Sequence, residues 1–375
     1  MIEQRMTNKE VKRKNRNAIF RYICKHHTIS NPEISYGMKL SLPTVTQNTK
    51  ELLKMGVIQE TGELESTGGR RAKALSPVTN ARYAIGLDIT KNHIGILLTN
   101  LLGEILEYER SYCPFELKAS YFEELNQRVK KFLEEKCIQD DVVLGIGISF
   151  PGIVDLQKKE ITNSHILNVK ELPFSEVETF FEYPCYFLND ANAGAFAEGI
   201  HSKQSDKFFY VSLSNTVGGA IFYEEKLVQG TSFRCGEVGH MTIIPDGKEC
   251  YCGKKGCFDA YCSAKQLADL ADGKLEEFFI QLKKRSEINV KAWQEYIYYL
   301  AIAVNNIHMV LDCDVILGGY VGSYLEEYIQ DIRKEVANHN TFEEKGEFVR
   351  NCNYKVAAAA YGAAMKVIEE FIEKI

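Results

Sequence analysis

The sequence has no long apolar run and no apolar segment at its start. Nowhere in the 375 residues does an uninterrupted apolar stretch approach the roughly 18 residues that a membrane-spanning helix needs. The first residues are polar and basic, and they lack the apolar centre of a secretory signal peptide. These absences argue against a helical membrane protein and against secretion. We therefore expect a cytoplasmic protein with no membrane partner.

The sequence also lacks a paired set of cysteines. Its 11 cysteines are an odd number, and in a chain without a secretory leader they favour a reducing compartment over disulfide bonds. Apolar residues make up 45% of the chain, which is enough for a sizeable core. A chain of 375 residues is too long for one small domain, so we expect two or three domains.

The net charge of −6 hides an uneven distribution of charge. Residues 1–80 hold 14 Lys and Arg against 7 Asp and Glu, whereas the remaining residues hold 31 against 44. The first part is therefore basic and the rest is acidic. A basic module ahead of an acidic body is typical of a nucleic-acid-binding head, although a basic surface that only contacts water would give the same count.

Two helix signals open the basic module. Apolar residues at helical spacing predict a first helix over residues 17–27. Its apolar stripe consists of Ile19, Phe20, Ile23 and Cys24. Ser30 and Glu33 make a capping box, and Pro32 suits a first turn, so we predict a second short helix that ends near Leu40.

A third helix is predicted between the cap Ser41 and Gly56. Its inner face consists of Val45, Thr49, Leu52 and Leu53. Short polar side chains lie mainly on the other side, and they are Thr44, Gln47, Asn48 and Lys50. Such a face suits a helix that enters the major groove of DNA and contacts base edges and phosphates. A polar helix face that only contacts water is the plainer alternative.

A basic hairpin follows this helix. Two strand signals, at residues 57–58 and 74–75, flank the loop Ser-Thr-Gly-Gly-Arg-Arg at residues 66–71. Arg70 and Arg71 are placed to contact phosphates or the minor groove, and the glycine pair allows the backbone to approach closely. Three helices and a basic hairpin together predict a winged helix-turn-helix domain over residues 1–80 that binds double-stranded operator DNA.

Residues 81–375 show a different pattern, in which strands alternate with helices. Buried-type strands end in carboxylate or amide side chains at Asp88 and at Asn189 with Asp190, and a later strand ends in a glycine pair at residues 318–319. This order predicts two successive α/β lobes.

One histidine and three cysteines lie within a short stretch of this body. They are His240, Cys250, Cys252 and Cys257. These are the ligand types of a tetrahedral structural Zn²⁺, and Gly253 and Gly256 allow a tight turn around it. Cys235 and Cys262 lie close by without such a turn, so we leave them out of the predicted site. A cluster of ordinary buried cysteines is the alternative.

Three motifs together resemble one known family. Residues 188–193 read Leu-Asn-Asp-Ala-Asn-Ala, residues 237–240 read Glu-Val-Gly-His, and residues 250–257 read C-x-C-G-x-x-G-C. These motifs resemble the ROK family of repressors, open reading frames and sugar kinases, and the basic loop at residues 66–71 resembles its xylose and N-acetylglucosamine repressors. The resemblance implies an α/β, actin-like, two-lobed sugar-kinase fold behind the winged helix-turn-helix, with a sugar in the cleft between the lobes.

The resemblance also implies a sugar site. Asn189 and Asp190 match the pair that binds the sugar in ROK kinases, where the aspartate also acts as the base. Glu237 and His240 match sugar-contacting positions, and His240 matches a metal ligand as well. Asp259 stands where the family usually has glutamate, so its reach to a sugar hydroxyl is shorter. A plain helix N-cap is the alternative role for Asn189 and Asp190, and the two roles can coexist.

Both glycine-rich phosphate turns of ROK kinases are altered in this sequence. Residues 88–92 read Asp-Ile-Thr-Lys-Asn where the kinases have Asp-x-Gly-Gly-Thr. Residues 214–220 read Ser-Asn-Thr-Val-Gly-Gly-Ala where the kinases have Gly-Thr-Gly-x-Gly-Gly-Gly. Side chains at these positions crowd a phosphate and restrict the backbone. We therefore predict a sugar-responsive repressor of carbohydrate-utilisation genes and not an enzyme.

Two alternatives to this repressor remain open. One is an active sugar kinase that carries a DNA-binding arm. The other is a repressor whose body no longer binds a ligand and only dimerises, which the shorter side chain of Asp259 favours. We expect a homodimer or tetramer, since a two-fold symmetric protein reads a palindromic operator. The effector is expected to be a monosaccharide or a sugar phosphate.

Overall fold

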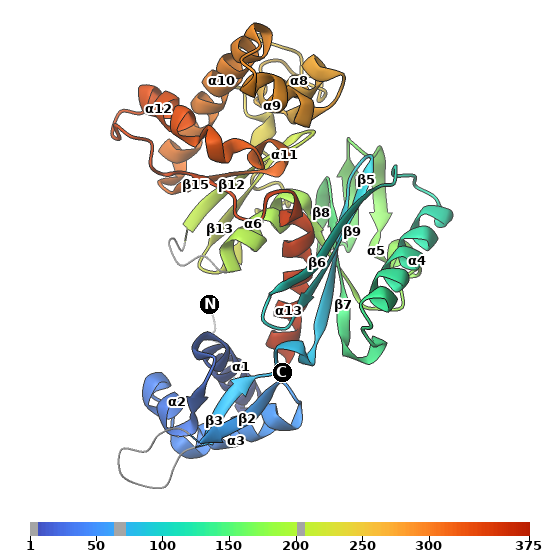
Figure 1. Cartoon of the computed structure of the whole chain (residues 1–375), viewed down its shortest axis with the longest axis vertical. Helices are drawn as coiled ribbons and strands as arrows, with labels where there is room; N and C mark the ends of the chain where they lie inside the picture. The colour runs from blue at the N-terminus through green and yellow to red at the C-terminus, as the bar shows by residue number, and fades with distance from the viewer. Residues whose placement is uncertain (1–6, 64–72, 201–206) are drawn as a thin grey trace.

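The computed structural model describes residues 7–63, 73–200 and 207–375, and it contains an N-terminal module and a larger body with two lobes (Figure 1). The N-terminal module packs its helices against a small sheet with strand order β1-β3-β2. Its elements are α1 (Asn8–His26), β1 (Ile29–Ser30), α2 (Asn31–Met38), α3 (Leu42–Lys54), β2 (Ile58–Glu63) and β3 (Lys73–Pro77). The predicted helices and flanking strands are confirmed, while the predicted loop at residues 66–71 lies outside the described residues.

Hydroxyl caps determine where the helices of this module begin. The side chains of Thr7, Ser30 and Ser41 each accept a hydrogen bond from the backbone amide three residues later. The carboxylates of Glu10 and Glu33 accept a hydrogen bond from the backbone amides of Thr7 and Ser30, which completes two capping boxes. The cap at Thr7 starts α1 earlier than the apolar stripe indicated, because the first turns of this helix are polar.

The first lobe is built on a five-stranded sheet with the order β11-β7-β4-β5-β6. Strands β4, β5 and β6 are antiparallel, while β7 and β11 run parallel to β4. A second sheet with the order β10-β9-β8 and two helices complete the lobe. The elements are β4 (Tyr83–Ile89), β5 (His93–Asn100), β6 (Ile105–Tyr112), α4 (Ala119–Glu135), β7 (Val143–Phe150), β8 (Ile153–Asp155), β9 (Glu160–Ser164), β10 (Val169–Pro173), α5 (Phe174–Glu178) and β11 (Cys185–Asn189).

The second lobe repeats this arrangement with the order β14-β13-β12-β15-β16. Its first three strands are again antiparallel, and β15 and β16 again run parallel to β12. The elements are β12 (Lys207–Leu213), β13 (Val217–Tyr223), β14 (Lys226–Leu227), α7 (Asp259–Cys262), α8 (Ala264–Ala268), α9 (Leu275–Lys283), α10 (Glu287–Leu311), β15 (Asp314–Gly318), α11 (Gly319–Gly322), α12 (Ile329–His339) and β16 (Val349–Asn351). The repeated strand order confirms the predicted two-lobed α/β fold.

Two helices, α6 (Asp190–Ile200) and α13 (Ala358–Lys374), pack against each other beside the sheets. Helix α13 lies directly on β4 and β7. A Cβ atom on Gly86 would lie 1.8 Å from the carbonyl oxygen of Ala360, and one on Gly147 would lie 1.9 Å from that of Ala363. Glycines in the strands and alanines in the helix therefore allow the backbones to touch.

The C-terminal half of α13 packs against the N-terminal module. Helix α1 passes close to the end of α13 (Figure 1), where Arg21 forms an ion pair with Glu369. Asn17 Nδ2 also donates a hydrogen bond of 3.2 Å to the carbonyl oxygen of Glu373. Buried apolar side chains of the module and of α13 belong to one continuous cluster. The module is thus attached to a helix that also packs on the body.

The predicted domain boundary after residue 80 falls in the short turn η1 (Thr79–Ala81) between β3 and β4, and it remains a prediction. Among the described residues, no helix combines the length and the apolar character that crossing a membrane requires.

Candidate functional site

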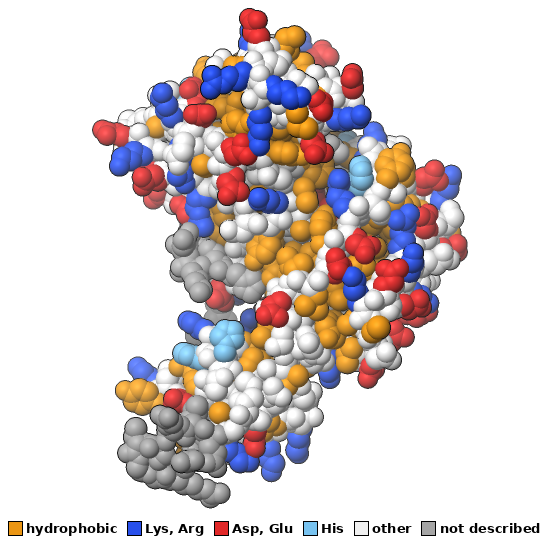
Figure 2. Space-filling model, in the orientation of Figure 1, with side chains coloured by type: hydrophobic (Ala, Val, Ile, Leu, Met, Phe, Trp, Pro, Cys, Tyr) orange, Lys and Arg blue, Asp and Glu red, His pale blue; other side chains and the backbone are white. Residues whose placement is uncertain are grey.

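One face of α3 is polar and exposed. Thr46, Gln47 and Lys50 are exposed on this helix, and Thr44 is half-buried. Figure 2 shows Lys and Arg side chains along the lower edge of the module, where Figure 1 places α3. Exposed hydroxyl and amide groups beside positive charge are what a helix needs to contact base edges and phosphates.

Asn48 does not lie on this face, which corrects the prediction made from the sequence. Its side chain is only 1% exposed, and its Nδ2 donates to the carbonyl oxygen of Thr44 at 2.8 Å. Residue 48 is three positions after Val45 and four before Leu52, both of which are buried, so helical geometry turns it toward the core. Thr46, which the sequence analysis left out, occupies an exposed position instead.

The basic residues of the hairpin, Arg70 and Arg71, lie outside the described residues, so their contact with DNA stays a prediction. The strands β2 and β3 that flank them pair in the antiparallel manner of a wing. Tyr36, in the helix before α3, is 90% exposed and adds an aromatic hydroxyl to this module. Tyr36 was not predicted as a site residue, because a single exposed tyrosine forms no pattern in the sequence.

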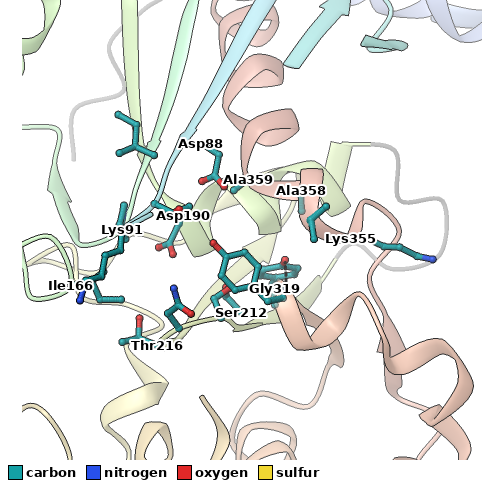
Figure 3. Close-up of a pocket in the computed structure, with 18 residues that line it drawn as sticks. Asp88, Lys91, Ile166, Asp190, Ser212, Thr216, Gly319, Lys355, Ala358 and Ala359 are labelled. Atoms are coloured by element: carbon teal, nitrogen blue, oxygen red, sulfur yellow. Dashed lines mark hydrogen bonds between the residues drawn. The ribbon is translucent and has the colours of Figure 1, made fainter. Parts of the chain in front are cut away.

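The cleft between the lobes contains a cavity of about 570 Å³, counted with its opening to solvent. Side chains from both lobes and from the segment before α13 line it, among them Asp88, Lys91, Asp190, Thr216, Tyr320 and Lys355 (Figure 3).

Asn189 positions Asp190 at the wall of this cavity. The Nδ2 of Asn189 donates to the carbonyl oxygen of Gly152 and to Oδ1 of Asp190, both at 2.9 Å. The Oδ1 of Asn189 accepts from the backbone amide of Asn192 at 3.0 Å. Asn189 therefore caps α6 and orients its neighbour at the same time, whereas sugar binding by this pair stays a prediction.

Two carboxyl groups at this cavity have raised pKa values. Burial raises the pKa of Asp88 to about 6, although Ser149 Oγ donates to it at 3.0 Å. Burial also raises the pKa of Asp190 to about 7, and the negative charges of Asp88 and Glu237 add to the rise. Asp190 is therefore able to donate as well as accept a hydrogen bond near neutral pH. Asp88 was not predicted as a site residue, although its place at the end of a buried strand indicates one.

Replacing Asp190 with asparagine is expected to stabilise the fold above neutral pH. The folded pKa of about 7 exceeds the ordinary value of 3.8, so the wild type loses stability as the pH rises between these two values. Asparagine carries no charge to bury, and its advantage grows over this range to about 1–4 kcal/mol. Urea unfolding at about pH 5 and about pH 8 measures the difference.

The control for this experiment is Asp141→Asn, which changes an exposed carboxyl group. This variant should differ from the wild type by the same small amount at both pH values. A pH-independent effect of Asp190→Asn would contradict the half-buried, charge-sensitive environment of Asp190.

In the two turns that correspond to the altered phosphate turns, side chains form hydrogen bonds with backbone groups. Between β4 and β5, Thr90 Oγ1 accepts from the amide of His93 at 3.1 Å and donates to its carbonyl oxygen at 2.9 Å. Between β12 and β13, the amide of Val217 donates to Oδ2 of Asp259 at 2.6 Å. An amide that already binds a carboxylate is not free to bind a phosphate.

The four predicted metal ligands lie together in the second lobe. The ligand atoms of His240, Cys250, Cys252 and Cys257 all lie within 4.8 Å of one another. The sulfur atoms of Cys252 and Cys257 are 3.8 Å apart, and Cys250 Sγ is 3.9 Å from His240 Nδ1. A tetrahedron with Zn–S bonds of about 2.3 Å has edges of about 3.8 Å, so the cluster has the dimensions of a tetrahedral site.

Two glycines allow the metal-ligand loop to turn as predicted. Gly253 and Gly256 have φ angles of +81° and +79°. A Cβ atom on Gly256 would lie 1.8 Å from the carbonyl oxygen of Ile244. Cys262 is not part of the cluster, since its Sγ donates to the carbonyl oxygen of Tyr296 at 3.7 Å.

The remaining predicted sugar residues lie near the cluster or near Asp190. Glu237 is exposed just before the short turn η3 (Val238–His240), and its charge acts on the carboxyl group of Asp190. Asp259 is 5% exposed, and like Asn189, Glu237 and His240 it is not among the residues that line the cavity. With one oxygen bound to Val217, its role toward a sugar stays a prediction.

Two aromatic residues near the metal cluster were missed by the sequence analysis. Tyr251 lies between two of the cysteines, and its hydroxyl is 3.2 Å from His240 Nε2. Its ring lies 5.6 Å, centroid to centroid, from the ring of His165, which follows β9 in the first lobe. Only the folded chain brings these two segments together, so no spacing in the sequence indicates the contact.

Comparisons with known proteins agree with this geometry. Residues 84–370 match the ROK family, and residues 12–59 match a winged helix-turn-helix DNA-binding family. The xylose repressor of Bacillus subtilis (strain 168) is 29% identical over 308 residues, which cover 79% of each chain.

Solved structures resemble the chain in the same way. A ROK family transcriptional regulator, described as a homologue of the E. coli MLC protein, has a TM-score of 0.79 at 20% identity and covers 97% of this chain and 98% of its own. A ROK family glucokinase from Streptomyces griseus, in complex with glucose and AMPPNP, has a TM-score of 0.63 at 23% identity and covers 76% of this chain and 98% of its own. The glucokinase matches a smaller share of this chain than the regulator does. The chain therefore belongs to the ROK family, with a winged helix-turn-helix module ahead of its two lobes.

Proposed function

We propose that this protein is a sugar-responsive transcriptional repressor of carbohydrate-utilisation genes. The observation that carries the proposal is the position of α13. Ala358 and Ala359 at its beginning line the cavity, and Glu369 near its end pairs with Arg21 of the DNA-binding module. A ligand that closes the lobes thus acts on the helix that holds the module, and it changes the spacing between the two modules of a dimer.

The proposed effector is a monosaccharide or a sugar phosphate in the cleft. Asn189, Asp190, Glu237 and His240 supply the donors and acceptors that sugar hydroxyls need. The B. subtilis relative is named a xylose repressor, so D-xylose is the first sugar to test.

Zn²⁺ is the proposed resident metal, held by His240, Cys250, Cys252 and Cys257. Three sulfurs and one imidazole nitrogen at tetrahedral spacing support this choice over a hard cation such as Mg²⁺, which prefers oxygen. When bound, the ion cross-links the loop. His240 then keeps one ring nitrogen on the metal side and presents the other toward Tyr251.

The proposed DNA complex is a homodimer or tetramer on a palindromic operator, with residues 1–80 of each chain in one half-site. Thr44, Gln47 and Lys50 contact base edges and phosphates, and Arg70 and Arg71 contact phosphates or the minor groove. As a repressor that acts on operator DNA, the protein is proposed to work in the cytoplasm.

Selection of binding sites from a random duplex library tests this proposal. We expect the purified protein to enrich a palindromic sequence, and Gln47→Ala to relax the preference at one position of each half-site by about 1–3 kcal/mol. Gln59→Ala, which removes an exposed amide from β2 instead of α3, is the matched control. Enrichment of no sequence by the wild type would contradict a repressor.

An active sugar kinase is the second candidate, since the fold also matches the glucokinase. Two features disfavour ATP binding. Side chains already bind the backbone of both turns that hold phosphates in the kinases, and the ring of Tyr320 lines the cavity. This ring directly follows Gly319 and lies 5.2 Å from the guanidinium carbon of Arg110, from the other lobe. A coupled ATP-hydrolysis assay with D-xylose separates the two candidates, and a repressor shows no sugar-dependent turnover.

A further inference from the structure

Tyr251 links the metal-ligand loop to the opposite lobe. It stands between Cys250 and Cys252, and its ring contacts two histidines from different parts of the chain. The centroid of His240 lies 5.3 Å away in the same lobe, and that of His165 lies 5.6 Å away in the first lobe. His165 is itself held by Asn163, whose Nδ2 is 3.0 Å from His165 Nε2. The loop that carries the metal ligands is therefore tied to the β9–β10 turn across the cleft.

His240 has only one ring nitrogen available for a ligand. Its Nδ1 faces Cys250 Sγ at 3.9 Å and belongs to the metal cluster. Its Nε2 is the remaining polar atom, and the Tyr251 hydroxyl occupies it at 3.2 Å. A sugar hydroxyl that binds His240 therefore has to replace the hydroxyl of Tyr251. Tyr251 is 50% exposed, so the side chain has space to leave.

We propose that Tyr251 is an occupancy sensor at the sugar site. In the empty site its hydroxyl binds His240 and its ring holds His165 of the opposite lobe. A sugar displaces the hydroxyl, the ring of Tyr251 no longer holds His165, and the two lobes are then free to close on the ligand. This inference rests on the proposed sugar contact of His240, and it adds a competitor for that contact and a route by which occupancy reaches the other lobe.

The contact between the rings of Tyr251 and His165, which we call the latch, is tested first and without any sugar. Hydrogen–deuterium exchange of residues 165–168, between β9 and β10, is compared in the wild type and in Tyr251→Ala. We expect exchange about threefold faster or more in the variant, because the turn loses its contact with the other lobe. Tyr298→Ala, which removes a similarly exposed tyrosine from α10, should leave this exchange unchanged. Equal exchange in the wild type and Tyr251→Ala would overturn the latch.

The competition is tested by calorimetric titration with D-xylose. Tyr251→Phe keeps the ring but removes the hydroxyl, so we expect D-xylose to bind about 2–10-fold more tightly, the equivalent of one hydrogen bond. Tyr298→Phe should bind as the wild type does. Equal or weaker binding by Tyr251→Phe would overturn the competition, and weaker binding would make Tyr251 a direct sugar contact. Absence of D-xylose binding to every variant would contradict D-xylose as the effector and the competition with it, while the exchange result on the contact between Tyr251 and His165 would still stand.

Discussion

Cys252→Ser is expected to abolish stoichiometric metal binding and to destabilise the second lobe. Serine replaces a thiolate by a hydroxyl, which is a poor ligand for Zn²⁺, and leaves three ligands where a structural site needs four. A metal at 1,000 times its dissociation constant stabilises the fold by about 4 kcal/mol, and this contribution is lost with the ion. Elemental analysis of the purified protein and a thermal unfolding curve measure the two effects.

The neighbouring Cys235 provides the matched control, since it is a cysteine of the same region outside the four-residue cluster. Cys235→Ser should keep the metal content and the unfolding temperature of the wild type. A full complement of zinc in Cys252→Ser, or no metal in the wild type, would contradict the proposed site. Removal of the metal from wild-type protein with a chelator should reproduce the destabilisation of Cys252→Ser.

The features predicted correctly from the sequence are those that local patterns encode. The caps at Ser30 and Ser41 predicted the starts of α2 and α3, because a hydroxyl that binds an amide three residues later acts within one turn. The spacing of the metal ligands indicated their cluster for the same reason, since Gly253 and Gly256 bend the chain over a few residues.

The features that the sequence analysis missed depend on contacts between distant segments. His165 and Tyr251 meet only because the lobes face each other across the cleft. The hydrogen bond from the amide of Val217 to the carboxylate of Asp259 likewise joins residues far apart in the sequence, while the sugar contact of Asp259 stays a prediction. Asn48 is a different case, because its position between Val45 and Leu52 already indicated burial, and its polar side chain obscured that signal.

Asp190→Ala is expected to produce a repressor that no longer responds to its effector. The proposed sugar effector, tested first as D-xylose, should release the wild type from its selected operator, because Asp190 lines the cavity whose closure acts through α13 on the DNA-binding module. The alanine variant should bind the same operator equally well, since Asp190 lies in the cleft and outside the module. Its half-maximal sugar concentration for release should rise by at least about 100-fold, which corresponds to the loss of a strong hydrogen-bonding group from a buried ligand. Gel-shift titrations with D-xylose measure both quantities.

The comparison of binding with release separates the roles of the two parts of the chain. Release of both proteins at the same sugar concentration would mean that the cleft is not the sensor, and the proposed mechanism would be wrong. A wild type that binds its operator but responds to no monosaccharide or sugar phosphate would instead favour a repressor whose body only dimerises. Arg21→Ala tests the connection between α13 and the module separately, because it removes the ion pair between α1 and Glu369 and leaves the cleft unchanged. If α13 transmits closure to the module, this variant should still bind D-xylose as the wild type does, yet require more sugar to leave the operator.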